Sequence, residues 1–289
     1  MPAAALSPQH IVPLDAADAA LAFMRLGDVL PLLEGYFLAL RAEADSVLAP
    51  RLPPAAGKPY PYGRCEEITR HVEGLLKQRL RAPANRVEAA LAGYRAAGGP
   101  VRSVWGALRG QYFQNALQIG YLYVDVANDT VNLAKPKVEI LPMAESGLVN
   151  VRDLAHFRDI AAIYWGGAAY ANTIAPALAP LLPILYYSPG RLNPSLQPAS
   201  DYMIALMMRD CFVQSEEWVL GGPAPPDDVA AMLAPRIPIG LRPKGADSRG
   251  EAVAACQLAR ANGFHNRKDW RDDVVRHYIR ILSSDVPAG

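Results

Sequence analysis

The sequence predicts an α+β fold that is mostly helical, with a small antiparallel sheet around residues 101–141 flanked by helices. Three observations predict this class. Apolar residues recur at helical spacing before residue 100 and again after residue 150. Between 101 and 141 the chain is instead rich in Tyr, Val and Phe, with glycines where turns are wanted. The composition, 51% hydrophobic and 20% charged, is that of an ordinary globular protein.

Helices are expected on both sides of the sheet, each delimited by capping or breaking residues. Asp28 is expected to cap the second helix, with Pro31 in its first turn. In the C-terminal half, Ser200 or Asp201 is expected to cap a helix that runs to Leu220. The expected helices are 15–26, 28–49, 64–80, 85–97, 151–165, 200–220, 227–233, 250–261 and 268–282.

The remaining segments define the domain organisation. Residues 1–13 are expected to form a loose tail, and residues 186–198 a Pro-rich loop. The long apolar stretch 160–185 contains three prolines, so we interpret it as buried core and not as a membrane span. No flexible linker divides the chain, and we therefore expect one compact domain over residues 1–289.

Charge and cysteine usage limit the partners and the compartment. Lys plus Arg total 29 and Asp plus Glu total 28, a balance that argues against a nucleic-acid or membrane-surface partner. The N-terminus lacks the basic and apolar regions of a secretory signal. Three cysteines without a CxxC motif are typical of a reducing compartment. We expect a cytoplasmic protein with a small-molecule substrate, and leave open a homo-oligomer.

Cys65 is the most informative residue of the sequence. It is expected to begin a helix directly after a loop rich in Pro, Gly and Tyr, residues 50–63. The helix macrodipole lowers the pKa of a thiol at this position, and Arg64 adds to that effect, whereas Glu66 and Glu67 oppose it. The alternative is that Cys65 is a small hydrophobic residue of the core.

The order of loop, Cys-bearing helix and antiparallel strands with polar residues resembles the core of papain-like and transglutaminase-like cysteine enzymes, over about residues 60–141. The resemblance implies that a Cys at a helix N-terminus meets a His on one strand and an Asp or Asn on the next. The segment 112–120 contains no His. A base would then come from elsewhere in the chain, with His156, His265 and His277 as the candidates.

Asp125 and Asp129 place two carboxylates in a short stretch. They could hold a cationic substrate group or a divalent ion. The alternative is a turn whose side chains bond their own backbone, and we favour it for Asn128 and Asp129. For Asp125 both interpretations stay open, because an acidic residue in an apolar strand must face solvent, a partner or a ligand.

These observations favour an enzyme that acts on a small, polar, amino-acid-like metabolite, a cysteine-dependent transferase or hydrolase without a cofactor. Cys65 would be the nucleophile or pocket thiol, Asn115 an orienting or oxyanion-binding amide, and Asp125 an electrostatic partner. One alternative is a helical, haem-dependent oxygenase or hydroxylase, an oxidoreductase with His156, or less favourably His71, as axial ligand. Another is a non-catalytic binding module or effector on a cysteine-enzyme scaffold that lost its base. No metal-binding motif is present in the sequence.

Overall fold

The computed structural model describes residues 9–55, 57–190 and 192–283. Contacts within the chain group it into two compact units, unit 1 (Met1–Asn150) and unit 2 (Val151–Gly289), where the sequence analysis expects one domain over 1–289. The boundary falls in a short connection between a strand and a helix. No Gly- or Pro-rich segment marks that connection, so the sequence carries no linker signal there.

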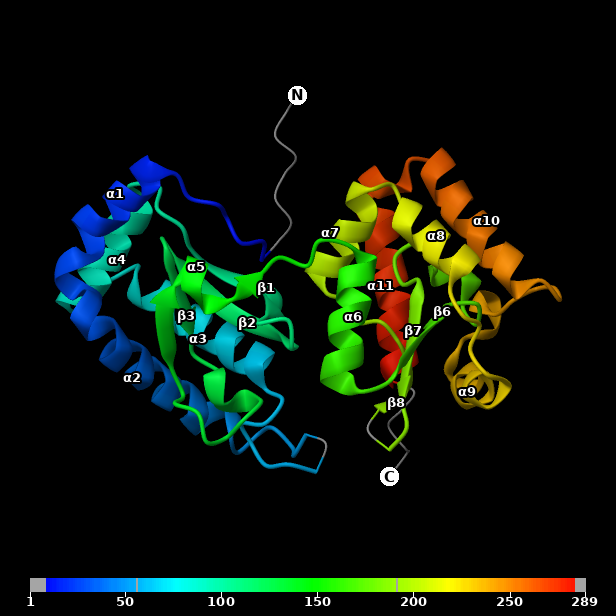
Figure 1. The fold of residues 1–289 in the computed structure, drawn as a ribbon, viewed down its shortest axis with the longest axis horizontal. Helices are drawn as coiled ribbons and strands as arrows, with labels where there is room; N and C mark the ends of the chain where they lie inside the picture. The colour runs from blue at the N-terminus through cyan, green and yellow to red at the C-terminus, as the bar shows by residue number, and fades with distance from the viewer. Residues whose placement is uncertain (1–8, 56, 191, 284–289) are drawn as a thin grey trace. The chain divides into compact units, whose positions relative to one another are not determined.

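The sheet of unit 1 is antiparallel and has the strand order β4-β3-β2-β1-β5 (Figure 1). Its long hairpin pairs β1 with β2 along their whole length, from Val101 opposite Ile119 to Leu108 opposite Tyr112. This confirms the α+β class and the antiparallel sheet, and adds one short strand after the expected range. The strands are β1 (Val101–Leu108), β2 (Tyr112–Ile119), β3 (Leu122–Asp125), β4 (Glu139–Pro142) and β5 (Leu148–Val149).

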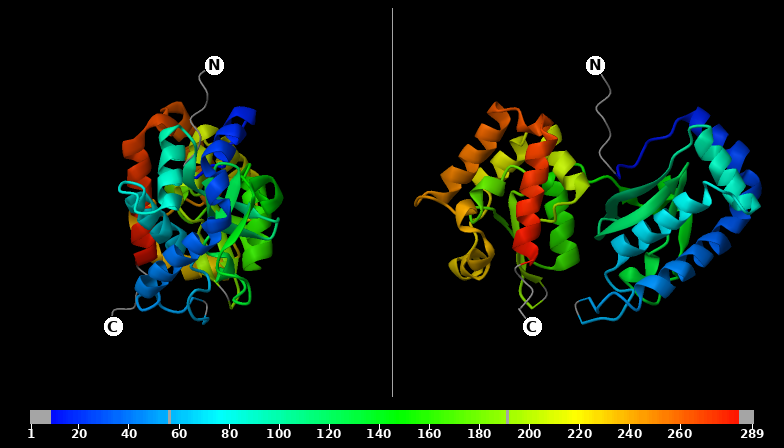
Figure 2. Two further views of the ribbon diagram at one scale, coloured as in Figure 1. Left: turned by 90° about the vertical axis from the view of Figure 1, so that its left-hand side faces the viewer. Right: turned by 180° about the vertical axis from the view of Figure 1, so that it is seen from behind.

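Four long helices of unit 1 pack their apolar sides on one face of this sheet (Figures 1 and 2). Side chains of Asp15 and Asn85 cap the first and the fourth of them. The expected cap at Asp28 is wrong. The chain passes between the first two helices through a 3-10 turn, so the residue before the second helix is not extended, as a capping residue must be. The helices are α1 (Ala16–Leu26), η1 (Gly27–Val29), α2 (Leu30–Leu48), α3 (Cys65–Arg79), α4 (Arg86–Ala96), η2 (Asn128–Thr130) and α5 (Met143–Ser146).

Unit 2 combines a three-stranded antiparallel sheet with helices. The sheet contains β6 (Ala168–Ala171), β7 (Ile184–Ser188) and β8 (Leu192–Leu196), so the loop expected over residues 186–198 is wrong. Pro194 is tolerated because β8 lies at the edge of the sheet, where a missing N–H breaks no ladder bond. In the apolar stretch 160–185, residues 171–185 are buried except Ala177, as expected, whereas none of residues 162–170 is buried; the stretch supplies β6 and part of β7.

The helices of unit 2 are close to those expected, with one interruption. Ser200 caps α7, but the helix ends at Arg209, because Cys211 and Phe212 both adopt left-handed backbone conformations. None of the helices described has the combination of length and apolar composition needed to cross a membrane. The helices are α6 (Leu154–Trp165), η3 (Pro176–Leu178), α7 (Asp201–Arg209), α8 (Val213–Gly221), α9 (Asp227–Leu233), η4 (Ala234–Arg236), η5 (Ile239–Leu241), α10 (Ser248–Ala261), η6 (Phe264–Asn266) and α11 (Lys268–Ser283).

Candidate functional site

The two faces of the unit 1 sheet carry different chemistry. Leu117 belongs to the core between the sheet and helices α1–α4, and Val124, opposite it on β3, belongs to the same core. Since side chains alternate along a strand, Asn115 on β2 also points toward the helices. The same alternation directs Gln114 and Asp125 to the opposite face of the sheet.

Cys65 and Asn115 meet on the helix side of the sheet. Cys65 is the first residue of α3, which packs on β2, and the Thr69 hydroxyl donates to the Asn115 backbone carbonyl at 3.1 Å. The Asn115 side chain donates from Nδ2 to Cys65 Sγ at 3.7 Å. Two of the three expected site residues therefore come together, while Asp125 lies on the other face.

The Cys65 thiol has a higher pKa than its position at a helix N-terminus predicts. Burial raises its pKa to about 11, and the hydrogen bonds from Asn115 offset only part of this effect. The expected help from Arg64 is lost, because its guanidinium donates to Glu67 at 2.8 Å and to the Pro53 carbonyl at 2.6 Å. At neutral pH the thiol is therefore protonated, although it lies at a helix N-terminus.

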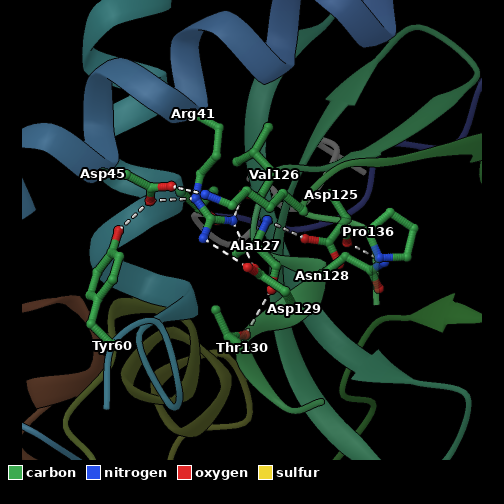
Figure 3. Close-up of polar contacts among 12 residues, drawn as sticks. Arg41, Asp45, Tyr60, Asp125, Val126, Ala127, Asn128, Asp129, Thr130 and Pro136 are labelled. Carbon is green, nitrogen blue, oxygen red and sulfur yellow. Dashed lines mark hydrogen bonds and ion pairs between the residues drawn. The ribbon is translucent and has the colours of Figure 1, made fainter. Parts of the chain in front are cut away.

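The buried side chain of Arg41 is the centre of the polar network drawn in Figure 3. Its guanidinium donates to both carboxylate oxygens of Asp129, at 2.8 and 3.1 Å, and to the Val126 carbonyl at 2.8 Å. The Nε atom donates to Asp45 at 2.7 Å. Burial alone would raise the pKa of Asp45, but hydrogen bonds from Arg41, Lys137 and Tyr60 hold it below its ordinary value.

This network fixes the loop that presents Cys65. The Tyr60 hydroxyl donates to Asp45 at 2.6 Å (Figure 3). The Gly63 N–H donates to the Thr130 carbonyl at 2.8 Å. The loop before Cys65 is thus tied both to α2 and to the turn after β3. Arg41 is not among the residues that the sequence predicts at the site. The available signal was its position four residues after Phe37, on the buried side of α2.

The turn interpretation of Asn128 and Asp129 is wrong in its contacts. The Asp129 carboxylate accepts from Arg41, and the Asn128 amide donates to the Pro136 carbonyl at 3.0 Å (Figure 3). Both partners lie outside the turn, so neither of these bonds is to the backbone of the turn itself. The reason is burial: both side chains lie inside unit 1, where a charge or an amide requires a strong partner.

Asp125 is fully buried on the face opposite Cys65. Its carboxylate accepts from Gln114 Nε2 at 2.7 Å, the Tyr123 hydroxyl at 2.7 Å and the Ala127 N–H at 2.8 Å. Burial raises its pKa to about 6 in spite of these three donors. All three donors to Asp125 belong to the same chain. The described residues contain no cluster of three or more His, Cys, Asp or Glu placed to hold a metal ion.

A small polar cavity lies beside the Cys65–Asn115 pair. Its volume is about 40 Å³, room for about one water molecule. Gln9 is one of its lining residues, and its Nε2 donates to Asn115 Oδ1 at 3.3 Å. Part of the expected loose tail is therefore held against the site, while residues 1–8 lie outside the described part. The cavity is lined by Gln9, Glu66, Thr69, Arg70, Glu73, Ser103 and Asn115.

His156, the residue considered for a haem, lies partly exposed on α6. Its Nδ1 accepts from the Arg152 N–H at 3.3 Å, and burial together with Arg152 lowers its pKa. Two cavities of unit 2, of about 360 and 550 Å³, are lined by other residues. His71 lines a groove on the outer side of α3 with charged neighbours, which is not the apolar slot that a haem requires.

The candidate site therefore consists of Cys65 and Asn115, with Gln9 bonded to Asn115 and with the loop before Cys65 tied to the Arg41 network through Tyr60. Comparison of the chain with protein-family models, with curated proteins and with solved structures finds no match.

Proposed function

We propose that unit 1 is a non-catalytic binding module with the arrangement of a cysteine enzyme, and that the surface around Cys65 and Asn115 is its ligand site. One observation carries the proposal: the group in contact with Cys65 Sγ is the carboxamide of Asn115, 3.7 Å away, where the resemblance implies a His. A carboxamide has no proton-accepting nitrogen at neutral pH, so it cannot serve as the general base for a thiol.

The protonation state of Cys65 supports the same conclusion. With a pKa of about 11, only about one thiol in a few thousand is ionised at pH 7.5. Asp125 cannot supply the missing function, because the sheet separates it from Cys65. The donors and acceptors around Asn115 are still suited to holding a polar ligand.

The test is the pH profile of Cys65 alkylation by iodoacetamide, followed by peptide mass mapping. We expect the Cys65 rate to rise about tenfold per pH unit from pH 7 to beyond pH 9, as for a thiol with a pKa near 11. The partly exposed Cys211 in the same molecule controls for reagent quality. Asn115→His adds a base at the required position and should raise the Cys65 rate at pH 7 at least tenfold.

A matched substitution controls for the histidine next to Gln9. His10 Nε2 lies 3.0 Å from Asn150 Nδ2, and His10→Gln should leave the Cys65 profile unchanged. A wild-type Cys65 that titrates below pH 8, or a Cys65 rate that drops when His10 is replaced, would overturn the proposal and restore the cysteine-enzyme hypothesis.

A further inference from the structure

We propose that unit 1 binds an extended polypeptide segment mainly through its backbone, and that residues 9–12 occupy this site in cis. The inference rests on the proposed function, names the class of ligand, and extends the site from Asn115 to the edge of β1 and to Gln118, whose side chain lies on the face of the sheet opposite Cys65. Figure 1 shows the segment as the dark blue coil that leads from the sheet to α1. Its contacts are of two kinds, backbone contacts at Gln9, Ile11 and Val12, and side-chain contacts at Gln9 and His10.

Two side-chain carboxamides each form hydrogen bonds with both the backbone N–H and the backbone carbonyl of one residue of the segment. Gln118 Oε1 accepts the Val12 N–H at 2.9 Å, and its Nε2 donates to the Val12 carbonyl at 2.7 Å. Asn150 Oδ1 accepts the Ile11 N–H at 2.8 Å, and its Nδ2 donates to the Ile11 carbonyl at 3.3 Å. Every residue except proline offers this N–H and carbonyl pair, so the contacts recognise a peptide and not a particular side chain.

The edge of the sheet supplies a third backbone contact. Along β1, the pairing with β5 involves Ala107 and Leu108. Beyond that point the Trp105 N–H donates to the Gln9 carbonyl at 2.9 Å, in the position that a neighbouring strand would take. An edge strand with outward N–H groups is the usual docking site for an extended segment that adds to a sheet.

Gln9 makes a contact to Asn115 that depends on its side chain, as His10 does to Asn150. Its Nε2 donates to Asn115 Oδ1, while the Nδ2 of the same Asn115 is committed to Cys65. The position over Asn115 therefore requires a donor. A carboxylate there would face Asn115 Oδ1 and the acidic side chains Glu66 and Glu73, while the cation that also lines the cavity, Arg70, is already paired with Glu66. Gln9 also has a left-handed backbone (φ 60°), a conformation that residues other than glycine rarely adopt unless neighbouring contacts fix it.

The first experiment uses the chain without residues 1–12, with its fold checked by circular dichroism. The probe is a fluorescent peptide of Gln9–Asp15, acetylated at its N-terminus, and binding is measured by anisotropy. N-methylation of Val12 removes an N–H that Gln118 accepts and should weaken binding at least tenfold. N-methylation of Leu14, whose N–H makes no hydrogen bond among the described residues, is the matched control and should change it less than threefold.

Protein variants test the same contacts from the other side. Gln118→Met keeps the shape but removes both amide groups and should weaken binding at least tenfold, whereas Gln111→Met, in the exposed turn after β1, should have no effect. A Gln9→Glu peptide should bind at least fivefold more weakly. Equal binding of the N-methyl-Val12 and unmodified peptides, or no binding at all by the folded chain, would overturn the inference.

A second measurement avoids the deletion, in case the shortened chain does not fold. A protease site inserted between Pro13 and Leu14 is cut in the folded, full-length protein. The released segment should co-elute with the protein on gel filtration, and excess Gln9–Asp15 peptide should displace it. The N-methyl-Val12 peptide should not. Immediate loss of the cut segment without competitor would overturn the inference.

The reactivity of Cys65 in the same samples separates this inference from the proposed function. Peptide binding together with a Cys65 that titrates below pH 8 would refute only the non-catalytic role. If Cys65 does not titrate below pH 8 and the peptide does not bind, only the assignment of a peptide as the ligand is refuted.

Discussion

Replacing Arg41 by Met should destabilise unit 1 more than any surface substitution of the same kind. The Arg41 side chain is 0% exposed, and that of its partner Asp129 is 7% exposed. Arg41→Met would leave the Asp129 carboxylate buried without its cation and the Val126 carbonyl without its donor. Removing one partner of a buried ion pair typically costs about 3–5 kcal/mol, a large part of the stability of a domain.

Two controls isolate the cause. Arg79 pairs with Glu43 at 2.9 Å, but both side chains are more than 40% exposed, so Arg79→Met should cost less than about 1 kcal/mol. Arg41→Met combined with Asp129→Leu removes the stranded charge, and should recover about 2 kcal/mol of the loss from Arg41→Met alone.

The assay follows unit 1 alone during urea unfolding. Trp105 is the one tryptophan within residues 1–150, so its ¹⁹F resonance in 5-fluorotryptophan-labelled protein reports on this unit. The reasoning is refuted if Arg41→Met lowers the free energy of unfolding by no more than Arg79→Met does. It is also refuted if the double variant is as unstable as Arg41→Met alone, because Arg41 would then not act by compensating the buried charge of Asp129.

Three further predictions concern other parts of the chain. Asp125 has its pKa raised from 3.8 to about 6, so the folded state binds more protons than the unfolded state between those values and stability falls by about 3 kcal/mol as pH rises through them. Asp125→Asn should remove this dependence in urea titrations at pH 4 and pH 7; an unchanged slope would contradict the assigned burial. A Cβ at Gly106 would lie 2.2 Å from the Val149 carbonyl oxygen, so Gly106→Ala should destabilise the fold by about 1–3 kcal/mol. Gly74 on α3 has open space around it, so Gly74→Ala should instead stabilise the fold by about 0.5–1 kcal/mol. Thermal melts of the two variants test whether their effects have these opposite signs. The absorption spectrum of the purified protein should lack a haem band. His156 Nδ1 accepts the Arg152 N–H, which places the proton of the neutral ring on Nε2, the atom that would have to bind the iron; a Soret band that shifts on reduction with dithionite would contradict this.

Local signals in the sequence predict most elements of unit 1. Gly110 and Gly120 adopt positive φ in the turns around β2, where the sequence analysis expects turns, and Asn85 caps its helix. The errors arise where tertiary contacts override local preference. β8 forms although it contains Pro194, because it pairs on one side only, and the helix from Ser200 breaks where the backbone turns left-handed at Phe212.

The contacts that support the site are long-range, and this is why sequence patterns do not reveal them. Arg41 and Asp129 are 88 residues apart, and Gln118 and Val12 are 106 residues apart. Each side chain is ordinary in its local context, an arginine in a helix and a glutamine in a strand. Only the packing of α2 beside the turn after β3, and of the N-terminal segment on β2, brings the partners together.

The relation of Asp125 to Cys65 depends on strand register. A slip of one residue between β2 and β3 would turn Asp125 toward the helices, because side chains alternate along a strand. The slip would also move Val124 and Val126 out of the helix-side core, where both are fully buried, at a loss of about 1.5–3 kcal/mol for each side chain. Packing therefore fixes the register that separates the two residues. An Asn115→His variant would thus gain a base for Cys65 but no carboxylate from Asp125 to orient it, and its Cys65 should become more reactive without acquiring the orienting partner of a complete triad.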